Sequence, residues 1–161
     1  MKTTTQYGRK ADRALSLWVK LARAFSVFAR SSDEDIARYG LTPAQFGVVE
    51  CLGHLGPMTL GQLCKKKLVS GGNMTVVVDN LEKMGLVERI HSREDRRAIV
   101  VQLTRKGKRM FKQIFPQHAR HITSLVAGLT EHEQDELARL LKKLGLSIQR
   151  RGSQGNAQEG G

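Results

Sequence analysis

Cysteine, proline and aromatic side chains are all scarce in this sequence of 161 residues. It has two cysteines, three prolines and 5% aromatic residues. No apolar run approaches the roughly 20 residues that a membrane-spanning helix needs, and residues 1–6 lack the apolar core of a signal peptide. A glycine-rich phosphate loop, a nucleophile elbow and an HExxH motif are also absent. We therefore expect a cytoplasmic protein that is not an enzyme, holds no cofactor and enters no membrane.

The two cysteines favour a reduced, intracellular chain. Cys51 and Cys64 both lie in helical patterns and are not arranged as a disulfide framework. The lysines that follow Cys64 would make its thiol more reactive, but its position beside Leu63 in an apolar pair favours burial. Packing is the preferred interpretation for both residues, and a redox role for Cys51 or Cys64 stays open.

The strongest compositional signal is positive charge. The formal net charge is +12, with a pI of about 10.2. Residues 60–112 include thirteen basic and five acidic residues, a net charge of +8 in about a third of the chain. This balance points to a polyanionic partner, although a solvated basic surface without a partner is the simpler alternative. The 40% hydrophobic content is enough for a real core.

An amphipathic helix is expected from residue 11, with an apolar stripe over residues 11–29 and an end at the acidic run 33–35 and Gly40. Its apolar residues recur at alternating steps of three and four and form a stripe of about five turns: Ala11, Ala14, Trp18, Leu21, Phe25 and Phe28. A small domain cannot cover a stripe of this length, so part of it is expected to contact another chain. The alternative is an ordinary core helix.

Three further helices are predicted by capping residues and apolar faces. Thr42 and Gln45 have the spacing of a capping box. Thr59 and Gln62 repeat it, and Ser70 caps the helix after that. This last helix has one apolar face, formed by Met74, Val77, Val78 and Leu81. Two short helices joined by a tight turn, the second with small and polar residues at its outward N-terminal end, fit a DNA major groove.

Residues 86–103 are predicted to form two short strands joined by a charged loop, because apolar and polar residues alternate on both sides of it. The loop carries Arg93, Arg96 and Arg97. Three arginines at the tip of a hairpin would repel one another in a core, whereas the negative potential of a narrow DNA groove suits them. We therefore interpret the hairpin as a wing.

Two helices are expected after the hairpin. Thr104 caps the first, which runs toward Gly128 with a bend at Pro116. Thr130 and Glu133 open the second with another capping box. Residues 150–161 contain no large apolar side chain and are predicted to be disordered.

Two histidines in the first of these helices invite a metal interpretation. His118 and His121, with acidic residues and His132 beyond them, could be assembled into a zinc site. Histidines three positions apart near a helix end are more often a dimer-core or surface pair. We therefore predict no metal site.

The run LEKMGLVERIHSREDRRAIVVQLTRKGKRM, together with the order of the elements, resembles the MarR (multiple antibiotic resistance regulator) family of winged-helix transcription factors. The resemblance covers residues 18–148, and its most specific parts are residues 81–89, 95–97 and 103–107. It implies a mainly α fold with a small β-hairpin wing (α+β). The implied parts are an N-terminal dimerisation helix (1–39), a winged helix-turn-helix DNA-binding lobe (40–104), C-terminal dimerisation helices (105–149) and the tail (150–161).

The resemblance also implies an obligate homodimer that reads a palindromic operator in double-stranded DNA. Arg97 falls on the family's wing arginine, which enters the minor groove, and Asp79 falls on the carboxylate that pairs with it. Arg96 is a second candidate. The expected DNA contacts are Lys65, Lys66, Ser70, Gly71, Gly72, Asn73, Thr75, Val76, Arg93, Arg96 and Arg97, with Asp79 and Asp95 orienting the wing.

Val76 departs from the family pattern, because many relatives have an arginine or another polar residue there. Valine can contact a thymine methyl group but cannot form the bidentate hydrogen bonds that read guanine. Specificity is then expected to rest on Asn73, Thr75 and the wing. If the helix is instead rotated, Val76 joins Val77 and Val78 in the core.

The function that the resemblance implies is a repressor that a small-molecule ligand releases from DNA, by a population shift between DNA-competent and incompetent dimers. Family members bind small aromatic anions between the dimer helices and the winged lobe, and the pattern does not identify those ligand-binding residues here. The family's peroxide sensors have a reactive cysteine near the start of the first helix, and this chain has none there. Two alternatives are a nonspecific architectural DNA-binding dimer and a helical dimer scaffold that binds an acidic protein.

Overall fold

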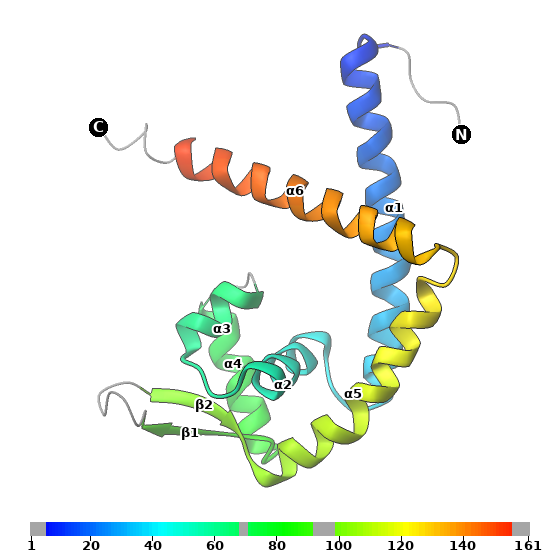
Figure 1. Ribbon diagram of the computed structural model, residues 1–161. Coiled ribbons are helices and arrows are strands. Elements are labelled where there is room, and N and C mark those ends of the chain that lie inside the picture. The colour runs from blue at the N-terminus through cyan, green and yellow to red at the C-terminus, as the bar shows by residue number, and fades with distance from the viewer. Residues whose placement is uncertain (1–5, 68–70, 92–98, 156–161) are drawn as a thin grey trace. The chain divides into compact units, whose positions relative to one another are not determined.

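The computed structural model describes residues 6–67, 71–91 and 99–155. In chain order these form α1 (Arg9–Ala37), α2 (Pro43–Leu55), α3 (Leu60–Lys67), α4 (Gly71–Lys83), β1 (Val87–His91), β2 (Ile99–Leu103), α5 (Arg105–Leu125) and α6 (Glu131–Gly155) (Figure 1). The predicted mainly helical fold with one antiparallel β-hairpin is confirmed. The chain divides into two compact units, residues 1–121 and residues 122–161, and the division falls within α5.

Side-chain caps begin three helices where the sequence predicts them. The Thr42 hydroxyl accepts a hydrogen bond from the Gln45 backbone N–H (3.2 Å), and the Gln45 amide oxygen accepts one from the Thr42 N–H (2.9 Å). The same reciprocal pair stands before α3 and before α6. Because each pair satisfies backbone donors that would otherwise lack a partner, these contacts fix where the helices start.

The hydrophobic core of the first unit lies between α2, α3, α4 and the hairpin. Figure 1 shows these three helices gathered beside β1 and β2. The most completely buried side chains are Val48, Val49, Leu63, Val78, Leu81, Leu86, Val87 and Val101. They come from every one of these elements, as expected where each helix and strand turns one apolar face inward. We refer to residues 40–104 as the winged lobe.

The root of the hairpin is held against the helices by backbone hydrogen bonds. Val87 lies opposite Leu103, and His91 lies opposite Ile99. Met58, just before α3, exchanges two backbone hydrogen bonds with Val101 (3.1 and 2.9 Å). The segment that leads into α3 is therefore tied to β2.

The corner between β2 and α5 requires a glycine. The Thr104 hydroxyl donates to the Gly85 carbonyl oxygen (2.7 Å) and accepts from the Gly107 backbone N–H (3.0 Å). Gly107 packs directly against the Leu86 carbonyl oxygen, with which a Cβ at this position would collide. The first turn of α5 therefore lies close to the segment that follows α4.

A buried polar cluster joins α1 to α5 within the first unit. His118 Nδ1 lies 2.9 Å from Asp35 Oδ2, and both residues are buried. The Tyr39 hydroxyl donates to the same carboxylate (3.3 Å), and Arg38 contacts it at 3.2 Å. Phe46 of α2 packs against the His118 ring, with centroids 4.6 Å apart. The cluster therefore extends to the winged lobe.

The charged form of Asp35 is the form that this cluster stabilises. Burial by itself raises the pKa of the Asp35 carboxyl. The hydrogen bond from His118, the charge of His121 and the hydroxyl of Tyr39 together outweigh burial, so the pKa lies below its ordinary value.

The first helix ends where the sequence indicates. The acidic run 33–35 and Gly40 are expected to close it, and α1 ends at Ala37. Its last turns are stabilised by distant partners, because Ile36 enters the core and Asp35 pairs with His118. The predicted disorder is wrong for residues 150–155, where α6 continues to Gly155. Glutamine and arginine favour helix even without apolar contacts.

Large apolar side chains are exposed on two of the helices. On α1 they include Trp18, which is 63% exposed, and Leu15, Leu17, Phe25, Val27 and Phe28. On α6 they are Leu137, Leu140, Leu141, Leu146 and Ile148. These side chains do not belong to a membrane-spanning segment, since none of the described helices is long and apolar enough to cross a bilayer.

We expect Asp35→Asn to lower the free energy of unfolding by about 1–3 kcal/mol at pH 7, because His118 and Tyr39 lose a charged partner. A carboxyl with a lowered folded-state pKa stabilises the fold above its unfolded-state pKa. That contribution is lost as the pH falls through the folded-state value. The difference between parent and variant should therefore shrink as the solution becomes more acidic than the usual aspartate pKa. Urea denaturation over a pH series measures it.

The matched control is Asp33→Asn, at an exposed position of the same helix. It should change the stability by less than about 0.5 kcal/mol at every pH. A loss for Asp35→Asn that does not depend on pH would contradict the role assigned to the carboxylate.

Candidate nucleic-acid interface

The outward face of α4 is polar and small, and its other face forms part of the core. Asn73, Thr75, Val76, Asn80 and Lys83 are exposed. The inward face consists of the predicted residues Met74, Val77, Val78 and Leu81, all buried. Val76 is 56% exposed. Its predicted outward position is confirmed, and the alternative of a rotated helix with Val76 in the core is wrong.

The chemistry of this face suits contact with base edges. An asparagine amide can form two hydrogen bonds to adenine, and the methyl groups of valine and threonine can contact the methyl group of thymine. Among the described exposed residues of α4, the only cation is Lys83, in the last turn. The first turns of α4 thus offer side chains that read adenine and thymine rather than the arginine fork that reads guanine.

A half-buried arginine fixes the angle between α4 and the hairpin. The Arg89 guanidinium, on β1, lies 2.6 Å from Asp79 Oδ1 and also pairs with Glu82. The Arg89 backbone N–H donates a further hydrogen bond to Glu82 (3.0 Å). Burial by itself lowers the pKa of the guanidinium, but the two carboxylates outweigh burial and raise it. We refer to Asp79, Glu82 and Arg89 as the Arg89 clamp.

Asp79 was expected to pair with Arg97, and in the described structure its partner is Arg89. Arg97 lies outside the described residues, so its pairing stays a prediction. Arg89 itself received no role from the sequence. A signal was present, because Val87 and Arg89 are two positions apart on a strand and therefore face the same side as the core. An arginine on that side requires a carboxylate partner.

The other predicted DNA contacts divide into three groups. Lys65 and Lys66 are exposed on α3. Gly71 and Gly72 form the first turn of α4. Ser70, Arg93, Asp95, Arg96 and Arg97 lie outside the described residues.

The cysteines and histidines that the sequence singled out do not gather at one place. Cys51 is buried and Cys64 is half-buried. His118 pairs with Asp35, and His121 Nε2 lies 3.1 Å from the Ser31 carbonyl oxygen. Among the described residues, no group of three or more His, Cys, Asp or Glu side chains is placed to hold a metal ion.

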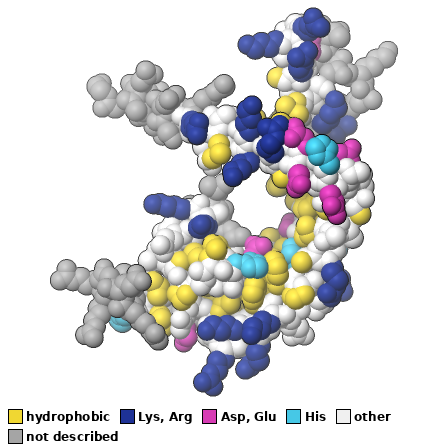
Figure 2. All heavy atoms as spheres, viewed as in Figure 1, with side chains coloured by type: hydrophobic (Ala, Val, Ile, Leu, Met, Phe, Trp, Pro, Cys, Tyr) yellow, Lys and Arg dark blue, Asp and Glu magenta, His cyan; other side chains and the backbone are white. Residues whose placement is uncertain are grey.

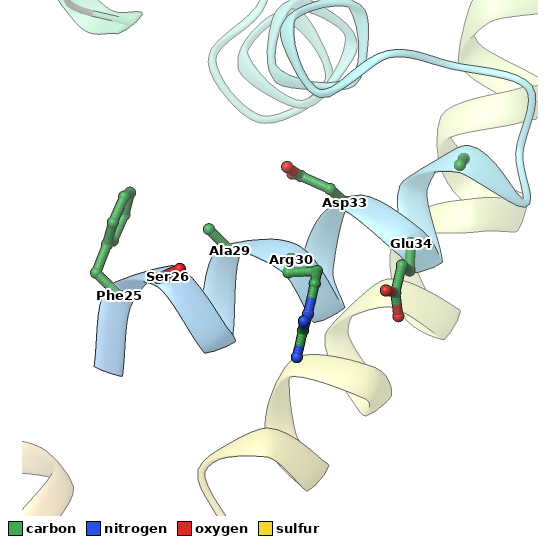
Figure 3. Close-up of a pocket in the computed structure, with 7 residues that line it drawn as sticks. Phe25, Ser26, Ala29, Arg30, Asp33 and Glu34 are labelled. Carbon is green, nitrogen blue, oxygen red and sulfur yellow. The ribbon is translucent and has the colours of Figure 1, made fainter. Parts of the chain in front are cut away.

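An open groove of about 630 Å³ runs along α1, lined by Phe25, Ser26, Ala29, Arg30, Asp33, Glu34 and Ala37. Figure 3 shows Phe25, Ala29 and Asp33 pointing to one side of the helix, with Arg30 and Glu34 pointing to the other. One guanidinium and two carboxylates give this lining a net negative charge. It therefore does not suit a small aromatic anion.

The comparisons with known proteins agree with this geometry. The sequence pattern of the MarR family matches residues 41–99, which include α2, α3, α4 and β1. The HTH-type transcriptional regulator YkoM of Bacillus subtilis (strain 168) is 37% identical over 140 residues, which cover 87% of this chain and 91% of YkoM. The HTH-type transcriptional regulator MhqR of the same organism is 36% identical over 136 residues, which cover 84% of this chain and 94% of MhqR.

Solved structures show the same fold. A crystal structure of a mutant MarR from E. coli, complexed with operator DNA, has a TM-score of 0.73 and 26% identity, and the match covers 85% of this chain and 99% of that one. BpsR of Bordetella bronchiseptica has a TM-score of 0.70 and 27% identity, and the match covers 81% of this chain and 98% of BpsR. Because relatives more than 30% identical match this chain over nearly their whole length, it belongs to the MarR family of HTH-type transcriptional regulators, a family of regulators rather than enzymes.

Proposed function

We propose that the protein is a sequence-specific regulator that binds a palindromic operator as a homodimer, represses transcription and is released by a small aromatic ligand. The observation that carries the DNA-binding part is the outward face of α4. Its small and polar side chains are exposed, while the Arg89 clamp holds the helix against the hairpin. The exposed Val76 side chain does not pack in the core. In a DNA major groove it could contact the methyl group of a thymine.

Relatives support this proposal. MarR of E. coli has been crystallised with operator DNA. MdtR of Bacillus subtilis, 27% identical over 137 residues, is an HTH-type transcriptional repressor. DNA binding by BpsR is regulated by 6-hydroxynicotinic acid. Repression and release by an aromatic acid are therefore the behaviour we propose for this chain.

DNA recognition would combine three kinds of contact. The first turns of α4 enter the major groove, where Asn73, Thr75 and Val76 meet base edges. Lys65 and Lys66 lie on the preceding helix and contact backbone phosphates, which position the protein without reading sequence. The loop after β1 carries Arg97, which is expected to enter the adjacent minor groove.

The exposed apolar residues of α1 support the proposed homodimer. Trp18, Phe25 and Phe28 lie along one helix face, and a soluble chain rarely leaves such a face uncovered. A second copy of the chain, related by a two-fold axis, would cover it with the same residues. Two lobes held in this way match a palindromic operator with half-sites one helical turn apart.

Ligand release requires two arrangements of the dimer that differ in DNA affinity. A ligand that binds one arrangement more tightly shifts the population toward it. The Asp35–His118 pair lies where α1 and α5 meet the winged lobe, so any change in the angle between these helices must alter its 2.9 Å contact. The groove on α1 does not suit an anion, and we assign no ligand site to it.

DNA selection tests the central proposal against a nonspecific architectural role. Duplexes selected from a random library by the full chain should share a palindrome whose half-sites lie about one helical turn apart. Footprinting on a selected duplex should show two protected half-sites. Uniform weak protection would indicate the architectural role, and no protection would indicate a scaffold for an acidic protein; both results contradict the proposal.

We expect the protein to sediment as a dimer, with twice the 17.9 kDa mass of one chain, at micromolar concentration. Trp18→Glu should shift it toward the monomer, because a charge would be buried in the interface. Leu55→Glu is the control, since Leu55 is similarly exposed but lies on α2. The Leu55→Glu variant should sediment as a dimer, as the parent does. A parent protein that sediments as a stable monomer would refute the dimer.

Val76→Ser should lower operator affinity by about 1 kcal/mol, selectively at one base pair, because contact with a thymine methyl group is lost. Melting temperature should change little, since Val76 is exposed. The control is Val77→Ser, which places a hydroxyl in the core and should cost about 1–3 kcal/mol of stability without changing base preference. Two measurements test whether Val76 contacts a base: affinity for a set of single-base operator variants, and thermal melting of each protein variant. If Val76→Ser binds every variant as the parent does, the groove contact is wrong.

A further inference from the structure

The first two turns of α5 carry five cations and no acidic residue. Arg105, Lys106, Lys108, Arg109 and Lys112 fall within eight residues, and all five are exposed. In Figure 2, Lys and Arg side chains gather at the lower edge of the view, where Figure 1 shows α5 beginning. The concentration of charge is higher than anywhere on the described part of the winged lobe.

Four of these cations lie on one face of the helix. Arg105, Lys108, Arg109 and Lys112 have the spacing i, i+3, i+4 and i+7, which aligns side chains along a helix. The opposite face packs inward through Gly107 and Ile114. The four form a row about 10 Å long, which we refer to as the basic stripe.

Within the described part of the chain, no carboxylate pairs with the basic stripe. The acidic residues of α4 and β1 have other partners. Asp79 and Glu82 pair with Arg89, and Glu88 accepts a hydrogen bond from Gln102. The 21 residues of α5 contain no aspartate or glutamate. Charge neutralisation must therefore come from solution or from a partner.

The position of the stripe also opposes the dipole of its own helix. The N-terminal end of a helix carries partial positive charge, which favours acidic and disfavours basic side chains. The first turn of α5 has no acidic residue and begins with Arg105 and Lys106. A residue pattern that destabilises its own helix is expected where function requires it. A polyanion bound at this face would offset the repulsion between these cations and the positive end of the helix dipole.

We propose that the basic stripe binds the phosphate backbone of DNA beyond the base pairs that α4 reads. This inference rests on the proposed DNA-binding function. DNA is favoured over an acidic protein, because protein interfaces depend on buried apolar or aromatic anchors and the described α5 exposes no large hydrophobic side chain. The start of α5 meets the C-terminal end of α4, where Lys106 Nζ donates to the Met84 carbonyl oxygen (2.8 Å). Asn73 lies about 16 Å further along the helix, so phosphates that reach the stripe lie outside the base pairs that the first turns of α4 read.

The proposal predicts that affinity depends on duplex length. Each phosphate contact releases counterions and steepens the dependence of log K on log salt concentration by about 0.9. Contacts outside the operator should therefore add affinity and salt dependence only when the duplex extends beyond it. A short duplex that contains only the selected palindrome lacks these phosphates.

The experiment compares two duplexes by fluorescence anisotropy, with the full chain. One is trimmed to the footprint of a selected palindrome, and the other has about 20 bp, two helical turns, of unrelated sequence added on each side. The stripe variant is Arg105→Gln, Lys108→Gln, Arg109→Gln and Lys112→Gln. A control variant with the same loss of charge is Arg9→Gln, Lys10→Gln, Arg13→Gln and Lys20→Gln, all exposed on α1.

The parent and the control variant should gain about tenfold in affinity from the added flanks at 0.1 M salt, with a steeper salt slope. The stripe variant should bind the trimmed duplex like the control variant and gain less than about twofold from the flanks. A flank gain in the stripe variant equal to that of the control overturns the proposal, as does the absence of any gain in the parent. Tight binding to the trimmed palindrome in these cases would leave the proposed function intact. If no palindrome is selected, the proposed function itself fails.

Discussion

The Arg89 clamp is the interaction on which the geometry of the winged lobe depends. Asp79 and Glu82 come from α4, and the guanidinium that joins them comes from β1, the strand that leads into the wing loop. The guanidinium bonds to both carboxylates, so the loss of either one removes a charged contact between β1 and α4. These contacts hold α4 against the root of the hairpin. A contact made by the wing loop with DNA would thus be set in register with contacts made by α4.

Most of the fold follows from local patterns, and the pairs that join its parts do not. Capping boxes predict where three helices start, and the alternation of apolar and polar residues predicts both strands. The helical period also puts Val76 on the outward face of α4. In contrast, Asp35 and His118 are 83 positions apart, and no periodicity connects them.

The two halves of α1 meet different demands. Its C-terminal end contributes Ile36 to the core and Asp35 to the buried pair with His118. Its middle and N-terminal parts expose Trp18 and Phe25, which the proposed homodimer would cover. One rigid helix thus joins the proposed dimer interface to the winged lobe. A change in the angle between two copies would reach the lobe through the Asp35–His118 contact, since a packed core does not deform continuously.

In the proposed complex with DNA, specificity and affinity would depend on different residues. Both acidic residues of α4 pair with Arg89 in the clamp. The outward face of the first turns of α4 is uncharged. Base reading by this face, as proposed, would rest on hydrogen bonds and methyl contacts, which salt screens weakly. Exposed cations lie on α3 and at the start of α5, and the phosphate contacts proposed for them would not depend on sequence. Substitutions in the basic regions can therefore tune binding strength to the ionic strength of the solution without altering which sequence is read. Changes at Asn73, Thr75 or Val76 would redirect the protein to another sequence at nearly constant nonspecific affinity.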